Sequence, residues 1–161
     1  MEELGEWLRA NMPDSPESTI VHGDYRLGNV MVAEEPPARL VAIFDWELST
    51  IGDPLADVGY LTVTWVEPDD PQDTMFANLS AVTRREGFLT REELIARYEE
   101  RTGRSVSALN WYQALALWKA AVFMEGNYKR FRAGNSDDEY LGLFDRGVPM
   151  LAEKAREIAF S

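Results

Sequence analysis

The chain has 161 residues, 45% of them hydrophobic and 27% charged, which suits one globular domain with its own core. Its 28 acidic and 16 basic residues give a formal net charge of -12, which argues against nucleic-acid binding through a basic patch. The absence of cysteine excludes disulfides and thiol catalysis, and no apolar run reaches the roughly 20 residues that span a bilayer. We therefore expect a cytoplasmic domain that binds neither nucleic acid nor membrane.

The first part of the chain predicts one helix followed by short strands. Apolar side chains recur at helical spacing in residues 2–11, and the two prolines of residues 12–18 end this helix. Residues 19–24 predict a short strand that runs into a loop. Residues 29–46 predict a β-hairpin, because two β-rich runs flank a Glu-Glu-Pro-Pro turn.

The chain after the hairpin predicts helices. Pro54 suits the first turn of a helix, and Asp53 is its expected cap. Residues 67–73 are an expected surface loop, since they are rich in acids and proline. Residues 90–103 combine a capping-box start with a glycine stop, which predicts another helix.

Two long helical segments complete the chain. Residues 107–135 predict a mostly apolar, buried helix, and residues 137–160 predict a last helical stretch that Pro149 kinks. The spacing in the first of these helices places the following side chains on its buried face: Trp111, Leu115, Trp118, Val122 and Met124. One small hairpin packed by several helices predicts a mostly helical α+β fold, with residues 1–161 as a single domain.

Three polar side chains stand at the ends of the predicted β runs. Asp24 opens the loop after the first strand, Asn29 closes that loop, and Asp45 follows the last apolar run of the hairpin. A hairpin returns the end of its second strand to the start of its first, so Asn29 and Asp45 should converge. Carboxylate and carboxamide oxygens suit Mg²⁺, and a nearby second carboxylate could accept a proton from a substrate hydroxyl.

The same residues follow a known motif. Residues 22–29, His-Gly-Asp-Tyr-Arg-Leu-Gly-Asn, match the pattern H-R-D-x-x-x-x-N with Gly in place of Arg, and Asp-Trp-Glu at 45–47 stands where D-F-G is expected. The chain thus resembles protein-kinase-like phosphotransferases. With residues 44–61, FDWELSTIGDPLADVGYL, it more specifically resembles the aminoglycoside phosphotransferase family, closest to the branch sometimes fused to acyl-CoA dehydrogenase domains.

The resemblance implies a chemical role for five residues. It makes Asp24 the catalytic base and makes Asn29 and Asp45 metal ligands, in a family that uses ATP and Mg²⁺. Arg26 stands where protein kinases carry a lysine that contacts the transferred phosphoryl group. Glu47 is an additional candidate metal ligand, directly or through water, although a solvated loop acid is an equally good interpretation.

Three further residues are expected to support the site rather than react. His22 is the only histidine, and we interpret it as a hydrogen-bonding support of the loop more readily than as a proton-transfer group. Asp53 and Asp57 are expected to cap the following helix and tie the loop down.

The chain lacks the parts that hold nucleotide in kinase-like enzymes. Its eleven glycines contain no G-x-G-x-x-G spacing, and its lysines are Lys119, Lys129 and Lys154, all in the predicted C-terminal helices. We therefore expect this chain to be the C-terminal lobe of a kinase-like fold that lacks the N-terminal nucleotide-binding lobe. The missing lobe is an expected partner of the chain. Alone, the fragment should be nearly inactive, and its exposed lobe interface should favour self-association.

Three functions remain open at this point. The first is ATP- and Mg²⁺-dependent transfer of the γ-phosphoryl group to a hydroxyl of a small molecule. The second is a catalytically inactive kinase-like module that binds ligands or partners. The third, a metal-dependent hydrolase, ranks last because a second metal cluster is missing. The acceptor could be an aminoglycoside, a choline-like amine, a sugar or a hydroxyacyl compound, with the resemblance slightly favouring the last.

Overall fold

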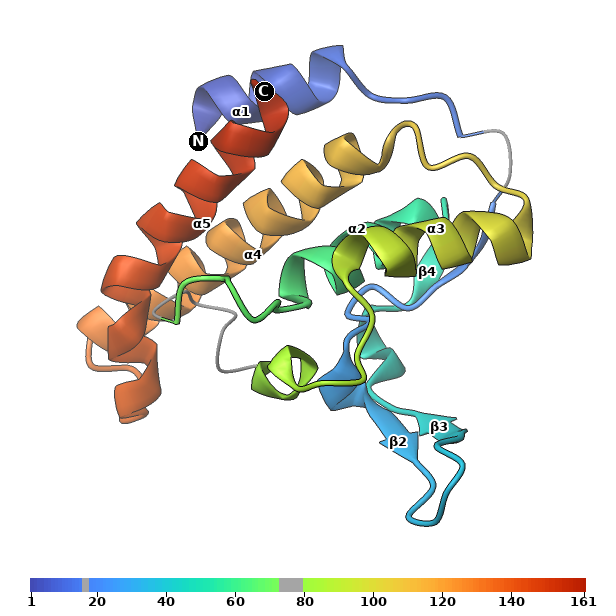
Figure 1. Cartoon of the computed structure of the whole chain (residues 1–161). Coiled ribbons are helices and arrows are strands. Elements are labelled where there is room, and N and C mark those ends of the chain that lie inside the picture. The colour runs from blue at the N-terminus through green and yellow to red at the C-terminus, as the bar shows by residue number, and fades with distance from the viewer. Residues whose placement is uncertain (16–17, 73–79) are drawn as a thin grey trace.

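The computed structural model describes residues 1–15, 18–72 and 80–161 (Figure 1). Parts of the two predicted loops, residues 16–17 and residue 73, lie outside this description. The helices and strands are, in chain order, α1 (Glu2–Ala10), β1 (Thr19–Val21), β2 (Val30–Val32), β3 (Leu40–Ile43), β4 (Thr50–Gly52), α2 (Leu55–Thr64), α3 (Arg91–Thr102), α4 (Leu109–Arg132) and α5 (Phe144–Ala159).

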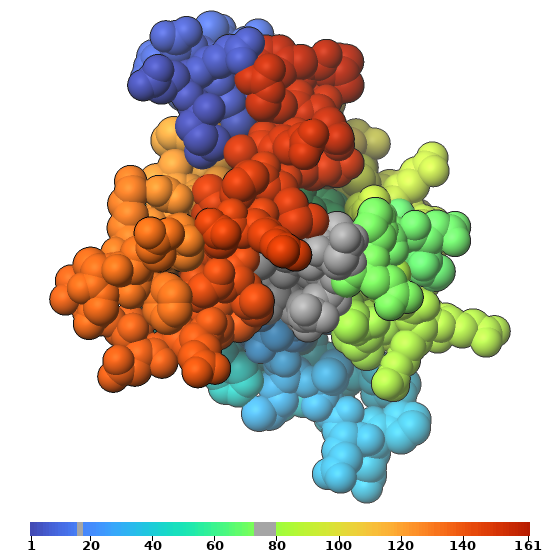
Figure 2. All heavy atoms as spheres, turned by 90° about the vertical axis from the view of Figure 1, so that its left-hand side faces the viewer, coloured from blue at the N-terminus to red at the C-terminus, as the bar shows by residue number. Residues whose placement is uncertain are grey.

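A helical body of α1, α4 and α5 forms the larger core. The N-terminal helix and the end of α5 lie together at one end of the molecule (Figures 1 and 2). Leu4 of α1, Leu117 of α4 and Leu151 of α5 are nearly inaccessible to solvent and belong to one hydrophobic cluster. Alanines of α4 and α5 complete this cluster and allow the two long helices to pack closely.

The buried face of α4 differs in part from the face that the sequence predicts. Trp111, Leu115, Trp118 and Met124 pack against the core but are only partly buried, and Val122 is exposed. The buried residues of α4 are Leu109 and Tyr112 near its start, and then Ala114, Ala116, Leu117 and Ala121. Because apolar residues surround most of this helix, its periodicity alone could not show which face meets α5.

A second contact joins α2 to α4. A Cβ atom at Gly59 of α2 would lie 2.8 Å from the backbone carbon of Tyr112, so only glycine permits this approach. Leu55, Val58, Leu109 and Tyr112 form the buried cluster at this crossing. Through it, α2 is fixed to the helical body, and α2 in turn positions the loops that precede it.

The strands form two separate two-stranded antiparallel sheets. The predicted hairpin is present as β2 and β3 and extends away from the helical body (Figure 1). The strand predicted at residues 19–24 ends at Val21, and it pairs with β4, with Ile20 opposite Ile51. The sequence did not predict β4, because three residues are too few to show a strand period.

The bounds of the remaining helices agree closely with those predicted from the sequence, except that the last predicted helix is divided in two. Helix α3 has the predicted capping box between Thr90 and Glu93 and ends at Gly103 in a left-handed conformation. The last predicted helical stretch is divided into a 3₁₀ turn, Glu139–Leu143, and α5, which continues through Pro149. Among the residues that the structure describes, no helix combines the length and apolar character needed to cross a membrane.

Candidate active site

The loop after β1 is held by one carboxylate of α2. Asp57 accepts hydrogen bonds from the backbone N–H groups of His22, at 2.6 Å, and Gly23, at 2.9 Å. Two backbone donors that would otherwise lack partners are satisfied by a charged acceptor on a well-packed helix. The start of the loop therefore has a fixed position relative to α2.

His22 joins this loop to the end of the hairpin. Its side chain is buried, with 3% of its surface exposed. Nε2 lies 2.6 Å from the carbonyl oxygen of Phe44, and Nδ1 lies 3.2 Å from the backbone N–H of Asp24. These partners require Nε2 to donate and Nδ1 to accept, which is the neutral Nε2–H tautomer. His22 thus sets the distance between the segments that carry Asp24 and Asp45.

Gly23 explains why the motif reads His-Gly-Asp. Its φ of 88° lies in the left-handed region that favours glycine. A Cβ atom there would also lie 2.5 Å from the carbonyl oxygen of Leu48. An arginine, as in the kinase pattern, cannot occupy this position without moving the backbone.

Asp24 lies at the centre of a polar cluster. The Nδ2 group of Asn29 donates to the backbone oxygen of Asp24, at 2.8 Å, and to its carboxylate Oδ2, at 2.7 Å. The Nε atom of Arg26 lies 3.5 Å from Oδ1. Burial, and then the charge of Asp24 and a hydrogen bond to it, raise the pKa of the Tyr60 hydroxyl. The carboxylate is therefore surrounded by three groups that hold it in place.

Asp45 and Glu47 lie beside this cluster, as the hairpin argument predicted for Asp45. The backbone N–H of Phe44 donates to the carbonyl oxygen of Asn29 at 2.8 Å, which places the next residue, Asp45, near Asn29. Asp45 itself has a left-handed φ of 67°. A hydrogen bond with Asp45, the charge of Asp45 and, more weakly, the charge of Asp24 raise the pKa of Glu47. The structure thus brings three carboxylates to the same mouth of the fold.

The donor set suits a magnesium ion that also binds substrate. Within the described residues, no three acidic or histidine side chains form a cluster that could hold a metal by themselves. Mg²⁺ commonly takes only one or two carboxylates and completes its shell with water and phosphate oxygens. Asn29 uses its Nδ2 group on Asp24, so its Oδ1 atom is the one that could act as a metal ligand.

Helix α2 begins one residue later than expected, so its N-cap is Pro54 and not Asp53, which precedes it. The Asp53 side chain still bonds to the first residue of the helix. Its Oδ1 accepts from the backbone N–H of Leu55 at 2.8 Å. Burial, and then a hydrogen bond to Asp53 and the charge of that residue, raise the pKa of Tyr112 in α4. Asp53 therefore connects the start of α2 with the helical body and lies outside the Asp24 cluster.

Two residues of the site were not singled out from the sequence. Tyr60 contacts Asp24, and the Trp46 ring lies 4.7 Å from the His22 ring. The signal for Tyr60 was available, because it follows Asp57 by three residues and therefore shares its helix face. The signal for Trp46 was its place in the Asp-Trp-Glu motif, where the sequence analysis assigned it no role.

Comparison with known proteins identifies the family. The model of the phosphotransferase enzyme family matches residues 1–115. The chain belongs to this phosphotransferase family. A solved structure from Ralstonia eutropha, provisionally described as an aminoglycoside phosphotransferase, has a TM-score of 0.77 and 33% identity, and the match covers 98% of this chain and 48% of that chain. The family and the mostly helical, kinase-like fold predicted from the sequence are thereby confirmed.

Relatives of similar sequence are named as acyl-CoA dehydrogenase family members. Acyl-CoA dehydrogenase family member 11 of Homo sapiens is 35% identical over 162 residues, which is 99% of this chain and 20% of that protein. The Gallus gallus protein of the same name is 37% identical over 166 residues, or 99% and 21% of the two chains. Member 10 of Mus musculus is 32% identical over 160 residues, or 99% and 15%. The chain spans about a fifth of the length of the first of these relatives.

Proposed function

We propose that this chain is the helical lobe of an ATP- and Mg²⁺-dependent phosphotransferase that transfers a γ-phosphoryl group to a hydroxyl of a small molecule. The observation that carries the proposal is the Asp24 carboxylate, bound by Asn29, close to Arg26 and accompanied by Asp45 and Glu47. In phosphoryl transfer, a carboxylate orients the acceptor hydroxyl, and oxygen ligands hold the metal that carries the phosphates.

Asp24 orients the acceptor hydroxyl and accepts its proton as the bond to phosphorus forms. Asn29 and Tyr60 act as positioning residues, because each contacts the Asp24 carboxylate. Holding this carboxylate before the substrate arrives removes an orientation cost from the reaction step. Arg26 offers a positive charge at the same place, where negative charge is distributed over the transferred group.

Asn29, Asp45 and Glu47 are the residues that would hold Mg²⁺. When bound, the ion neutralises phosphate charge and keeps the phosphates aligned. The left-handed backbone of Asp45 supports this role, because a non-glycine residue in that conformation is uncommon and is concentrated at functional sites.

The β2–β3 hairpin offers a surface for a nucleotide-binding lobe from outside these 161 residues. Apolar side chains are exposed on its strands and directly after β3: Met31, Val32, Leu40, Val41 and Phe44. Neighbouring exposed apolar side chains are a common feature of interfaces. We propose that the partner lobe packs here, and that the same surface promotes self-association when the lobe is missing.

The test is Asp24→Asn in the protein that carries this chain together with its nucleotide-binding lobe. ADP release should fall by about 10³-fold, because the general base is removed, while ATP affinity stays within about twofold. The control is Asp69→Asn, which removes the same charge from an exposed loop and should leave turnover unchanged. Unchanged turnover in Asp24→Asn would exclude the proposed role of Asp24.

A further inference from the structure

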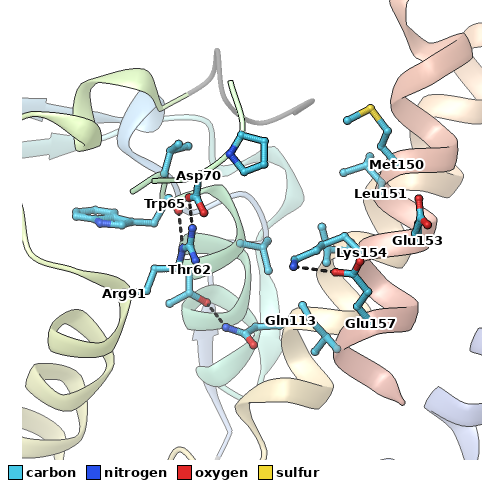
Figure 3. A pocket seen from close by; sticks show the side chains of 15 residues that line it. Thr62, Trp65, Asp70, Arg91, Gln113, Met150, Leu151, Glu153, Lys154 and Glu157 are labelled. Atoms are coloured by element: carbon cyan, nitrogen blue, oxygen red, sulfur yellow. Dashed lines mark hydrogen bonds and ion pairs between the residues drawn. The ribbon is translucent and has the colours of Figure 1, made fainter. Parts of the chain in front are cut away.

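A cavity of about 540 Å³ lies between α2, α4, α5 and the segment of residues 65–71. Figure 3 shows its two sides: Thr62 and Trp65, with the Arg91–Asp70 pair, face Met150, Leu151 and Lys154 of α5 across the opening. A volume of this size is within the range of small-molecule sites. None of the residues assigned to catalysis or to metal binding lines it.

Helix α2 connects this cavity to Asp24. Tyr60, which contacts Asp24, precedes Val63 of the cavity wall by three residues and therefore lies one turn away on a similar face. At a rise of 1.5 Å per residue, the backbone positions 60 and 63 are about 4.5 Å apart along the helix. An elongated molecule with one end at Asp24 can therefore extend along α2 into the cavity.

The cavity wall is mainly apolar. It includes Val63 of α2, Val66 just after the end of α2, Leu117 of α4 and Leu151 of α5. Leu117 and Leu151 also belong to the core of the helical body. The uncharged polar side chains of the wall, Gln113 and Thr62, bond to each other: Nε2 of Gln113 donates to the Thr62 hydroxyl at 3.0 Å. A ligand here gains chiefly from burying apolar surface.

Four of the five charged side chains of the wall form ion pairs. Arg91 bonds to Asp70 and also lies 3.2 Å from Glu67. Lys154 lies 2.9 Å from Glu157 at the exposed rim. Recognition of a polycation would require several acids free to pair with it, whereas Asp70 and Glu157 already have basic partners. Among the described residues of the wall, Glu153 is the one acid without an ion pair, and it is exposed.

We infer that the cavity binds the body of the phosphoryl acceptor and selects an elongated, uncharged, apolar molecule with a terminal hydroxyl over a polycationic one. The inference rests on the proposed function in one respect, that Asp24 acts on the hydroxyl of the acceptor. Binding of the apolar body in the cavity does not depend on the proposed function. It names a class of acceptor by its chemistry: an aliphatic or aromatic alcohol whose hydroxyl reaches Asp24.

Binding is tested with the full 161-residue chain, without nucleotide. We expect 4-phenyl-1-butanol to shift the backbone amide NMR signals of Thr62, Val63 and Leu151 in a saturable way. Kanamycin, a polycation with many hydroxyls, should not shift these signals at the same concentrations. Kanamycin binding at these amides with the lower Kd would overturn the inference.

Two substitutions locate the binding. Met150→Trp fills the cavity from α5 and should raise the Kd of the alcohol at least tenfold, whereas Met12→Trp, the same change at an exposed residue, should alter it less than twofold. Val63→Phe narrows the cavity from α2, and it replaces Met150→Trp if circular dichroism shows that the latter is unfolded. An unchanged Kd in a folded cavity variant places the alcohol elsewhere and refutes the inference.

Transfer assays separate the two proposals. Asp24→Asn should bind the alcohol with a Kd within threefold of the parent, since the apolar body is held by the cavity. Preferred phosphorylation of kanamycin by the two-lobed protein would refute the cavity inference and support the proposed function. Cavity binding of the alcohol, with no transfer to any acceptor, would support the site and refute the proposed function.

Discussion

The loop region that carries Asp24 and the helical body are stabilised in different ways. Between residues 19 and 52 the strands are three or four residues long, and the paired residues Ile20 and Ile51 remain 64% and 68% exposed. In the helical body, Leu4 and Leu117 are almost completely buried among α1, α4 and α5. Apolar burial therefore stabilises the body, whereas the loop region depends on hydrogen bonds to a few polar side chains.

The difference has a chemical reason. A reactive carboxylate must remain accessible, so its loop cannot be buried in a core, and its backbone groups need polar partners instead. Asp57, His22 and Asn29 provide these partners. The left-handed residues Gly23 and Asp45 also lie in this region, where the surrounding hydrogen bonds hold their backbone in place.

Asp57→Asn gives the largest expected effect on stability. An asparagine can accept from only one of the two backbone N–H groups of His22 and Gly23, because its NH₂ group faces the other donor. We expect the free energy of unfolding to fall by about 2–3 kcal/mol. Urea denaturation measures it, with Asp14→Asn at an exposed position as the control. A loss as small as that of the control would show that this hydrogen-bond network does not hold the loop.

Two glycine substitutions test the packing of the helical body, and they should change its stability in opposite directions. Gly59→Ala puts a Cβ atom 2.8 Å from the backbone of Tyr112, so α2 and α4 must separate, at a cost of about 2 kcal/mol. Gly126→Ala in α4 meets nothing within 4 Å and should stabilise the helix by about 1 kcal/mol. Thermal denaturation compares them directly, and equal changes in Tm would mean that the tight α2–α4 contact is unimportant.

The smallest effect concerns the Arg91–Asp70 pair at the cavity. Burial acts to raise the pKa of Asp70, but hydrogen bonds from Arg91 and the Glu67 backbone, with the charges of Arg91 and Arg84, lower it overall. A lowered pKa in the folded protein contributes stability above the unfolded value, near pH 4, that is lost as pH falls through the folded value. Asp70→Asn should therefore cost less than about 1 kcal/mol at pH 7.

The pH series checks this assignment. The stability difference between the parent and Asp70→Asn should shrink as pH falls below 4, because the parent carboxylate then becomes neutral. A difference that stays constant from pH 7 to pH 3 would mean that the variant acts through packing rather than through charge.

Much of the site was predictable because its residues are close in sequence or lie at the ends of one hairpin. Asp24 and Asn29 belong to one motif, and a hairpin necessarily returns Asp45 to Asn29. The contact of Tyr60 with Asp24 was not predicted, since it depends on how α2 packs below the loop. The cavity was not predicted either, because its walls come from four helices distant in sequence.

Local chemistry by itself determined the helix caps, the hairpin, the family motif and the acidic cluster, since each depends on residues a few positions apart. Only the tertiary structure decided which face of α4 is buried, that β1 pairs with β4, and where α5 stands opposite α2. The physical reason is that apolar side chains surround α4 on most sides and three-residue strands have no period. Long-range packing, not local preference, selects among the arrangements that such segments allow.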